Sequence, residues 1–221
     1  RALPAFAPDA PMGTKADDDF YGIVEGIDRL AEGLKTDAEA AGATLKNRHR
    51  VHDIVRKDGM FEITGDYGKK AEAKPFTYQA KRVILATCRC SLTNFSVLKD
   101  APLLKQLGTS ALIRIYAVYP PDPSTKRVWF AGLAGTGLPK TVTANPLRYV
   151  IPIDEKSGLI MISYTDGPDT EYWRALEEPD LTAAIQKHAR ELFHDRTIPE
   201  PTYLAKHDWP SGCTYWLPGT Y

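Results

Sequence analysis

Hydrophobic residues recur every three or four positions between residues 24 and 41, which is the spacing of one face of an α-helix. The residues on this face are Val24, Ile27, Leu30, Ala31, Leu34 and Ala38. Gly42 follows them, and glycine is common just beyond a helix end because it adopts a positive φ without strain. The pattern therefore predicts a helix over about residues 24–41.

A group of strands is predicted after this helix, at residues 44–46, 51–56, 60–64 and 78–87. Asp58-Gly59 separates the second from the third, and this dipeptide is typical of a two-residue hairpin turn. The last strand contains Val83-Ile84-Leu85, which is apolar without alternation. Such a run is expected of a strand that is buried on both faces.

The second half of the chain predicts a mostly antiparallel sheet with one helix. The strands are expected at residues 111–119, 128–131, 149–153, 159–164 and 203–206. Ser157-Gly158 is a turn signal between two of them. Asp180 is expected to cap a helix that runs to about Phe193 and turns its Leu and Ile side chains inward. Helices combined with antiparallel strands predict an α+β fold.

Composition excludes several classes of function. Of the 221 residues, 43% are hydrophobic and 25% charged, and Lys+Arg and Asp+Glu are equal at 28 each. The chain therefore has no net positive charge that would attract nucleic acid or an anionic membrane surface. No apolar run approaches the ~20 residues of a membrane-spanning helix, and no signal peptide is visible. The chain begins at Arg1 rather than Met, so we expect a processed or trimmed chain, and its compartment is not indicated.

The spacing of the cysteines does not predict a metal site, and the spacing of the glycines does not predict a phosphate site. Cys88 and Cys90 lie two residues apart without a nearby His to complete a metal ligand set, so we interpret them as small buried residues after a strand. The Gly-rich stretch 132–137 reads G-x-x-G-x-G and precedes Pro139 rather than a helix, which favours a hairpin or lid loop. No G-x-G-x-x-G follows an opening strand, so no pyrophosphate cradle is predicted.

The order of these elements resembles the FAD-dependent amine oxidase family, which includes monoamine, polyamine and L-amino-acid oxidases. Phe20-Tyr21-Gly22-Ile23 is similar to the family's loop into a helix, although the usual Gly-Gly pair is interrupted by Ile23. Val51 matches the position where a Val backbone meets the adenine end of FAD. Ala86 and Thr87 end a strand similar to the one whose small residues lie beside the cofactor. The resemblance thus implies cofactor contacts at Val51, Ala86 and Thr87.

The resemblance continues on the substrate side. The strand around Arg114 matches one on which many members carry a Lys near the flavin ring, and an Arg there stays charged and cannot serve as a tunable base. The stretch 209–219 resembles the segment that leads back to the flavin, and some members attach FAD through a Cys near the position of Cys213. The resemblance implies that Tyr215 and Trp216 form walls of an amine pocket, because an aromatic face attracts a cation.

Each of these assignments has an alternative that the sequence leaves open. Tyr215 and Trp216 are equally explained as core aromatics. Cys213 is better explained as a free buried thiol than as a flavin linkage. Arg114 is expected either in solvent or in a structural ion pair, with contact to a flavin edge as the other possibility.

The resemblance divides the chain into an extended lead-in (1–16), a partial FAD-binding segment (17–97), a substrate-domain-like sheet with a helix (98–208) and a return segment (209–221). The implied function is that of a fragment or subunit of a flavoprotein that oxidises an amine C–N bond to an imine. The alternative is a non-catalytic scaffolding or binding subunit of a larger assembly. FAD is expected only when missing segments are supplied by another polypeptide or a precursor fragment, because the chain stops at Tyr221, before the family's last flavin-binding stretch.

Overall fold

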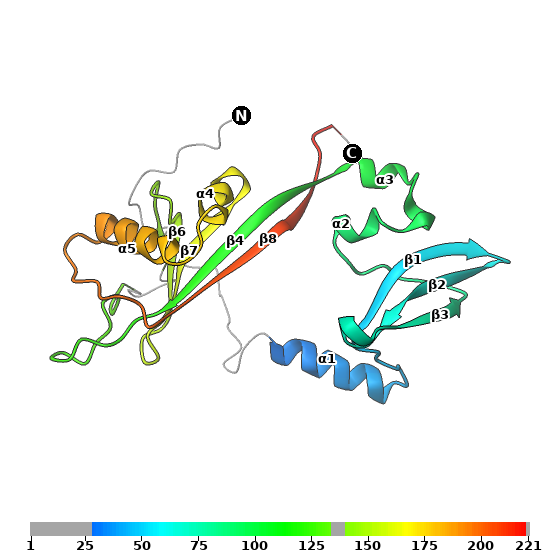
Figure 1. Cartoon of the computed structure of the whole chain (residues 1–221), viewed down its shortest axis with the longest axis horizontal. Helices are drawn as coiled ribbons and strands as arrows, with labels where there is room; N and C mark the ends of the chain where they lie inside the picture. Colours follow the sequence, from blue (N-terminus) through cyan, green and yellow to red (C-terminus); the bar gives the residue numbers. More distant parts are fainter. Residues whose placement is uncertain (1–27, 134–139, 220–221) are drawn as a thin grey trace, which may run out of the picture. The chain divides into compact units, whose positions relative to one another are not determined.

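The computed structural model describes residues 28–133 and 140–219, which fall into two compact units (Figure 1). The three-stranded unit comprises residues 28–107 and 216–219, and the five-stranded unit comprises residues 108–133 and 140–215. Helices and antiparallel strands occur together, so the fold class is α+β, as predicted. No helix in the described ranges is long and apolar enough to cross a membrane.

The three-stranded unit is built on an antiparallel meander in the order β1-β2-β3. Its strands are β1 (His49–Lys57), β2 (Met60–Tyr67) and β3 (Lys74–Ala80). Asp58 and Gly59 both have positive φ, at 51° and 77°, which is the geometry of the predicted two-residue turn. Helical segments flank the sheet: α1 (Asp28–Ala40), η1 (Lys70–Glu72), α2 (Arg89–Leu92), η2 (Ser96–Leu98) and α3 (Pro102–Lys105).

Two strand predictions in this unit are wrong. Residues 44–46 form no strand, and β3 ends at Ala80, so Val83-Ile84-Leu85 lie outside any sheet. Ile84 is 93% exposed rather than buried. The physical reason is the lack of a partner, since residues 82–86 form no backbone hydrogen bond with another strand in the described part of the chain. A strand is defined by pairing, and an apolar run alone does not provide it.

The predicted first helix exists, but no residue of α1 is buried. Leu30 and Leu34, on its apolar stripe, are 54% and 62% exposed. Residues 24–27 of the predicted helix lie outside the described ranges, as does the lead-in 1–16. The helical periodicity is therefore confirmed, while the burial that normally accompanies such a stripe is absent for these two leucines.

The five-stranded unit contains a sheet in the order β5-β6-β7-β4-β8. Its strands are β4 (Leu107–Val118), β5 (Thr141–Val142), β6 (Tyr149–Asp154), β7 (Leu159–Asp166) and β8 (Tyr203–Trp216). β4 pairs antiparallel with β7, which pairs antiparallel with β6. The helical segments are η3 (Gly167–Asp169), α4 (Thr170–Arg174) and α5 (Asp180–Leu192).

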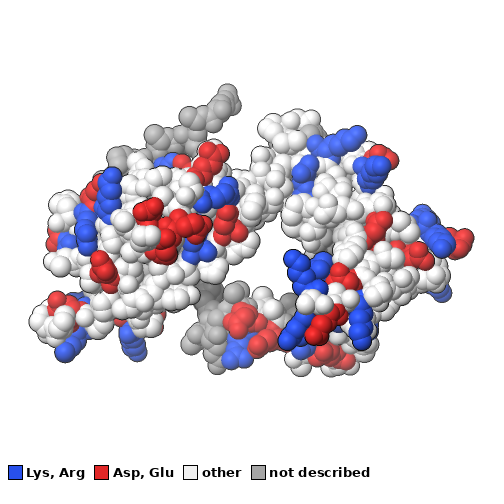
Figure 2. Space-filling view, viewed as in Figure 1, with Lys and Arg blue, Asp and Glu red and all other residues white. Residues whose placement is uncertain are grey.

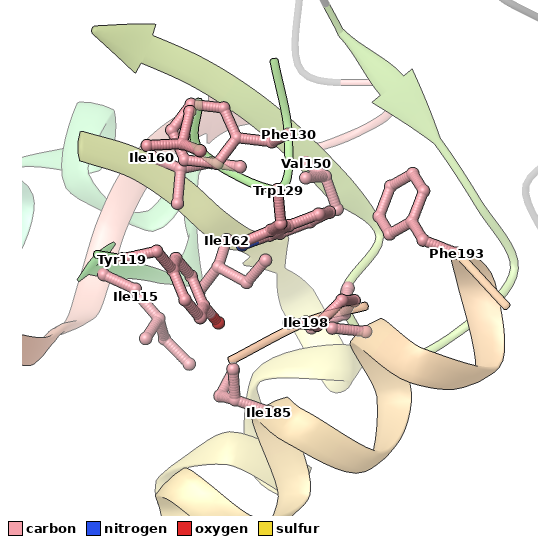
Figure 3. Close-up of a cluster of buried hydrophobic side chains, with 14 of the residues drawn as sticks. Ile115, Tyr119, Trp129, Phe130, Val150, Ile160, Ile162, Ile185, Phe193 and Ile198 are labelled. Carbon is pink, nitrogen blue, oxygen red and sulfur yellow. The ribbon is translucent and has the colours of Figure 1, made fainter. Parts of the chain in front are cut away.

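Helix α5 and the residues around it bury one face of this sheet (Figure 3). On β4 the core residues are Ile113, Ile115 and Ala117, each fully buried, and Ile185 of α5 is also fully buried. Trp173 of α4 has no exposed surface and donates its indole N–H to the Pro146 carbonyl at 2.9 Å. The alternation along β4 places every second side chain in this core and the intervening ones on the opposite face.

Three further predictions for this half need correction. Residues 128–131 form turns instead of a strand, although Trp129 and Phe130 are 8% and 0% exposed and pack in the core. Strand β8 continues to Trp216, so it is much longer than the predicted 203–206. Asp180 is the first helical residue of α5, and Pro179 takes the cap position. Most of the Gly-rich loop 132–137 lies outside the described ranges.

Acidic and basic side chains are interspersed over the visible surface of both units (Figure 2). This mixing agrees with the equal numbers of the two signs in the sequence. The arrangement offers no broad basic surface on this face of the kind that nucleic acids bind.

Candidate functional site

The face of the five-stranded sheet opposite the core carries a group of six side chains that we call the aromatic face. It consists of Arg114, Tyr116, Tyr149, Tyr164, His207 and Trp209. Arg114 and Tyr116 alternate on β4 with the buried Ile113 and Ile115, so they project from the other side of the sheet. Four neighbouring strands, β6, β7, β4 and β8, therefore contribute to one surface.

Strand register places Arg114 beside two tyrosines. Arg114 is the direct pairing partner of Tyr164 across β4 and β7. The guanidinium carbon lies 5.0 Å from the centre of the Tyr164 ring, which is a cation–π contact. Tyr164 in turn packs against Tyr149 of β6, with ring centres 5.6 Å apart. The Nζ atom of Lys140 lies 4.2 Å from the centre of the Tyr149 ring and ends this row of contacts.

Strands β4 and β8 form the second part of the aromatic face. Tyr116 meets His207 edge to face, with ring centres 5.7 Å apart. His207 stacks on Trp209 at 5.7 Å with the rings only 20° from parallel. His207 and Trp209 are both exposed, so this part offers flat ring surfaces to a ligand. Aromatic rings in this arrangement suit a planar or cationic partner.

Arg114 is the charged group at the centre of this surface. Its Nε atom is buried and has no hydrogen-bond partner, and no carboxylate forms an ion pair with it in the described part of the chain. Partial burial acts to lower the pKa of the guanidinium, but the Tyr116 and Tyr164 hydroxyls outweigh it and the pKa lies above its ordinary value. The side chain thus carries a permanent positive charge and cannot accept a proton. Among the described residues, the structure shows no ion pair that would support the structural alternative.

The residues predicted from the return segment lie on β8 and are exposed. The Tyr215 ring packs on Gly108 of β4, and a Cβ atom added at Gly108 would lie 2.6 Å from Tyr215 Cζ. Glycine at position 108 is therefore required for this close approach. Tyr215 and Trp216 are 48% and 50% exposed, so neither is a core residue.

Cys213 is a free cysteine and is exposed, so the prediction of a buried thiol is wrong. Strand β8 forms the edge of the sheet, and its residues 212–216, which include Cys213, are all exposed. Its attachment to a flavin stays a hypothesis.

The predicted cofactor contacts of the first half lie in the three-stranded unit. Val51 is on β1 and is 37% exposed. Ala86 and Thr87 are exposed and lie in the segment between β3 and α2. Their side chains and backbone are accessible, and their contact with a cofactor remains a prediction.

Sequence reasoning missed most of the aromatic face. Tyr116 and Tyr149 lie at positions that alternate with apolar residues in a predicted strand, whereas Tyr164 lies between Ser163 and Thr165. That alternation could have assigned Tyr116 and Tyr149 to the side of the sheet opposite the core, but it gives no such signal for Tyr164. Their contact with Arg114 could not be found in this way, because it depends on which strands are neighbours.

The two cysteines after residue 87 are also exposed, which corrects the interpretation of Cys88 and Cys90 as buried residues. They follow the unpaired segment 82–86, so no sheet covers them. Within the described ranges, no group of three or more His, Cys, Asp and Glu side chains is placed to hold a metal ion.

Comparison with protein families matches residues 8–221 to the model described as flavin containing amine oxidoreductase. The match covers both units and the aromatic face. Comparison with curated proteins found no match.

Proposed function

The chain belongs to the flavin-containing amine oxidoreductase family, and from this premise we propose that it forms the substrate-binding side of a flavoprotein that oxidises amines. The aromatic face carries this proposal. It brings together aromatic rings from four strands and the permanently charged guanidinium of Arg114, and it lies on the face of the sheet opposite the core. Such a surface can orient an organic amine and exclude water around it.

The chemistry that bound FAD would supply is acceptance of a hydride from the carbon of the amine C–N bond, which would leave an imine as the oxidised product. The roles of this chain are binding and orientation. We assign Tyr164 and Tyr116 to packing against the substrate, and Arg114 to the acceptor-rich edge of the flavin ring. Tyr215 and Trp216 are assigned to the walls of the amine pocket, because half-exposed rings can still gain contact with a ligand.

The charge of Arg114 favours a neutral amine at this surface. A protonated amine would gain about 0.5–2 kcal/mol from an aromatic wall. The same cation would be repelled by the guanidinium of Arg114 and by Lys140, which lies over Tyr149. A neutral amine keeps the ring contacts without this repulsion.

The described residues fit FAD in part. In the three-stranded unit, Val51, Ala86 and Thr87 are exposed and therefore accessible for cofactor contact. The sequence contains no Gly-rich pyrophosphate loop of the G-x-G-x-x-G type. We therefore propose that FAD is held jointly with another polypeptide or a precursor fragment.

The segment 82–86 supports the need for such a partner. Its backbone forms no hydrogen bond with another strand among the described residues, and its central residue Ile84 is 93% exposed. An added strand would satisfy these backbone groups and cover the apolar side chains. The proposal therefore places the partner on the three-stranded unit.

A second candidate function is a non-catalytic subunit that keeps the family fold as a scaffolding or binding module. The observation that favours it is the permanently charged Arg114 at a position where the resemblance implies a Lys. A Lys can lose its proton and act as a base, whereas this Arg cannot.

The visible absorbance spectrum of the protein purified from its native source separates the two candidates. The proposal expects flavin absorbance that bleaches when an amine is added without oxygen. Tyr164→Leu should slow this bleaching, and Tyr172→Leu is the matched control because Tyr172 lies on α4, on the core side of the sheet. Native material without flavin would favour the scaffolding function, and bound flavin that amines do not reduce would refute oxidation of the amines tested.

A further inference from the structure

Two exposed cysteines lie in contact at the start of α2. The Sγ atoms of Cys88 and Cys90 are 2.8 Å apart. Two thiols at this separation share a hydrogen bond and need only a small movement to reach the ~2.05 Å of a disulfide. Both residues are exposed and neither is in a disulfide, so reagents in solvent can reach them.

The local backbone holds this pair in place. The Ser91 and Leu92 N–H groups donate to the Cys88 carbonyl at 3.0 and 3.1 Å. Arg89, between the two cysteines, donates its Nε–H to the Leu104 carbonyl at 3.2 Å and ties α2 to α3. These bonds hold the segment from Cys88 to Leu92, which contains both thiols, so their proximity is built into the fold of this segment.

Cys88 is the more reactive thiol by its surroundings. Hydrogen bonds from the Cys90 thiol and, next, from the Ser91 hydroxyl lower the pKa of Cys88 to about 6. At pH 7 the thiolate of Cys88 then exceeds the thiol roughly tenfold, and the thiolate is the form that attacks sulfur. A second thiol beside an accessible thiolate is the arrangement of redox-sensitive cysteine pairs.

We propose that Cys88 and Cys90 form a redox-active dithiol that closes to an intramolecular disulfide when it reacts with a small-molecule disulfide. The Cys88 thiolate attacks one sulfur of the external disulfide, its S–S bond breaks, and one thiolate leaves. Cys90 then loses its proton to solvent and attacks Cys88 Sγ, which releases the second thiolate. The protein loses two electrons and two protons, and one external disulfide is reduced to two thiols.

Oxidised glutathione is the probe that tests this proposal. The full chain is incubated with it at pH 7, the remaining thiols are blocked with N-ethylmaleimide, and tryptic peptides are weighed. Trypsin cleaves after Arg89, so Cys88 and Cys90 fall on the separate peptides 83–89 and 90–99. We expect these two peptides to stay joined, to carry neither glutathione nor maleimide and to lack two hydrogens, and dithiothreitol should separate them. Cys213 is the control within the same molecule, because it is exposed and has no second cysteine in contact among the described residues. It should retain glutathione as a mixed disulfide.

Single variants separate the two steps. Cys90→Ser should trap glutathione on Cys88, because no second thiol is present to release it. Ser91→Ala keeps both thiols but removes one hydrogen bond to the thiolate. If the Cys88 pKa rises by one unit, alkylation at pH 6 should slow about fivefold, while the disulfide still forms.

Two results would overturn the proposal. One is a wild-type chain in which Cys88 or Cys90 retains glutathione as the final product. The other is a chain in which both cysteines still take up maleimide after the incubation.

Discussion

Replacing Arg114 by Met tests whether this residue serves function or folding. The substitution removes the charge and keeps an unbranched stem of similar reach. In the structure, the guanidinium gains a cation–π contact with Tyr164 at 5.0 Å, worth about 0.5–2 kcal/mol. Against this stands a buried Nε without a partner, a situation that costs about 1–3 kcal/mol. The two effects oppose each other, so we expect the free energy of unfolding to change by less than about 1 kcal/mol.

Arg174→Met is the matched control. Arg174 holds Asp208 through two hydrogen bonds of 2.6 and 2.7 Å and thereby joins α4 to β8. Its removal leaves a carboxylate without this partner, and we expect a loss of about 1 kcal/mol, the upper end for partly exposed pairs. The same chemical change should therefore destabilise the protein more at position 174 than at position 114.

Denaturant unfolding followed by tryptophan fluorescence measures both variants, because Trp129 and Trp173 are buried in the same unit as the two arginines. Flavin reduction by an amine, measured on the assembled protein and normalised to folded molecules, provides the functional comparison. We expect Arg114→Met to reduce it severalfold and Arg174→Met to leave it unchanged. If Arg114→Met instead loses 2 kcal/mol or more and reduction per folded molecule is unaffected, Arg114 is structural and its assignment to the flavin edge is wrong.

Five other outcomes are expected. Titration of the isolated chain with FAD should yield no stoichiometric complex of micromolar affinity, since the sequence offers no pyrophosphate loop. Such a complex would contradict the proposal that FAD is held jointly with another polypeptide or a precursor fragment. Native mass spectrometry should show the chain bound to another polypeptide or precursor fragment, and a well-behaved monomer would argue against the partner. Trp216→Ala should lower turnover strongly and the melting temperature only slightly, because the ring is 50% exposed; a lowered melting temperature with normal turnover would show that Trp216 is only structural. Cys213→Ser should leave the flavin content unchanged. Hydrogen bonds from the Ser96 backbone and hydroxyl lower the pKa of Asp53 below 3.8, so its contribution to stability is present above that pH and is lost as pH falls through the lowered value. The stability difference between wild type and Asp53→Asn should vanish over this acidic range, and a difference that is constant with pH would show that Asp53 is not responsible.

Turns and helices were determined by the sequence through short-range preferences. Asp58-Gly59 forms the predicted hairpin turn because both residues accept positive φ. Gly158 has a φ of 75°, and a Cβ there would collide with the Tyr119 carbonyl, so this turn also follows from its residue type. The helical period of residues 180–192 likewise predicted α5 and its buried face. Each of these signals depends on residues that are neighbours in the chain.

Strand pairing and the candidate site were decided by tertiary structure. The apolar run Val83–Leu85 has the composition of a buried strand, yet it stays unpaired because a strand needs a hydrogen-bonding neighbour. Strand β8 extends to Trp216 because β4, about a hundred residues earlier, provides a long edge for it. Arg114 meets Tyr164 through the register of β4 and β7, a relation between residues fifty positions apart that no local pattern encodes. The sequence thus determined the elements and, by resemblance, the family, whereas the order of the strands determined which side chains share the aromatic face.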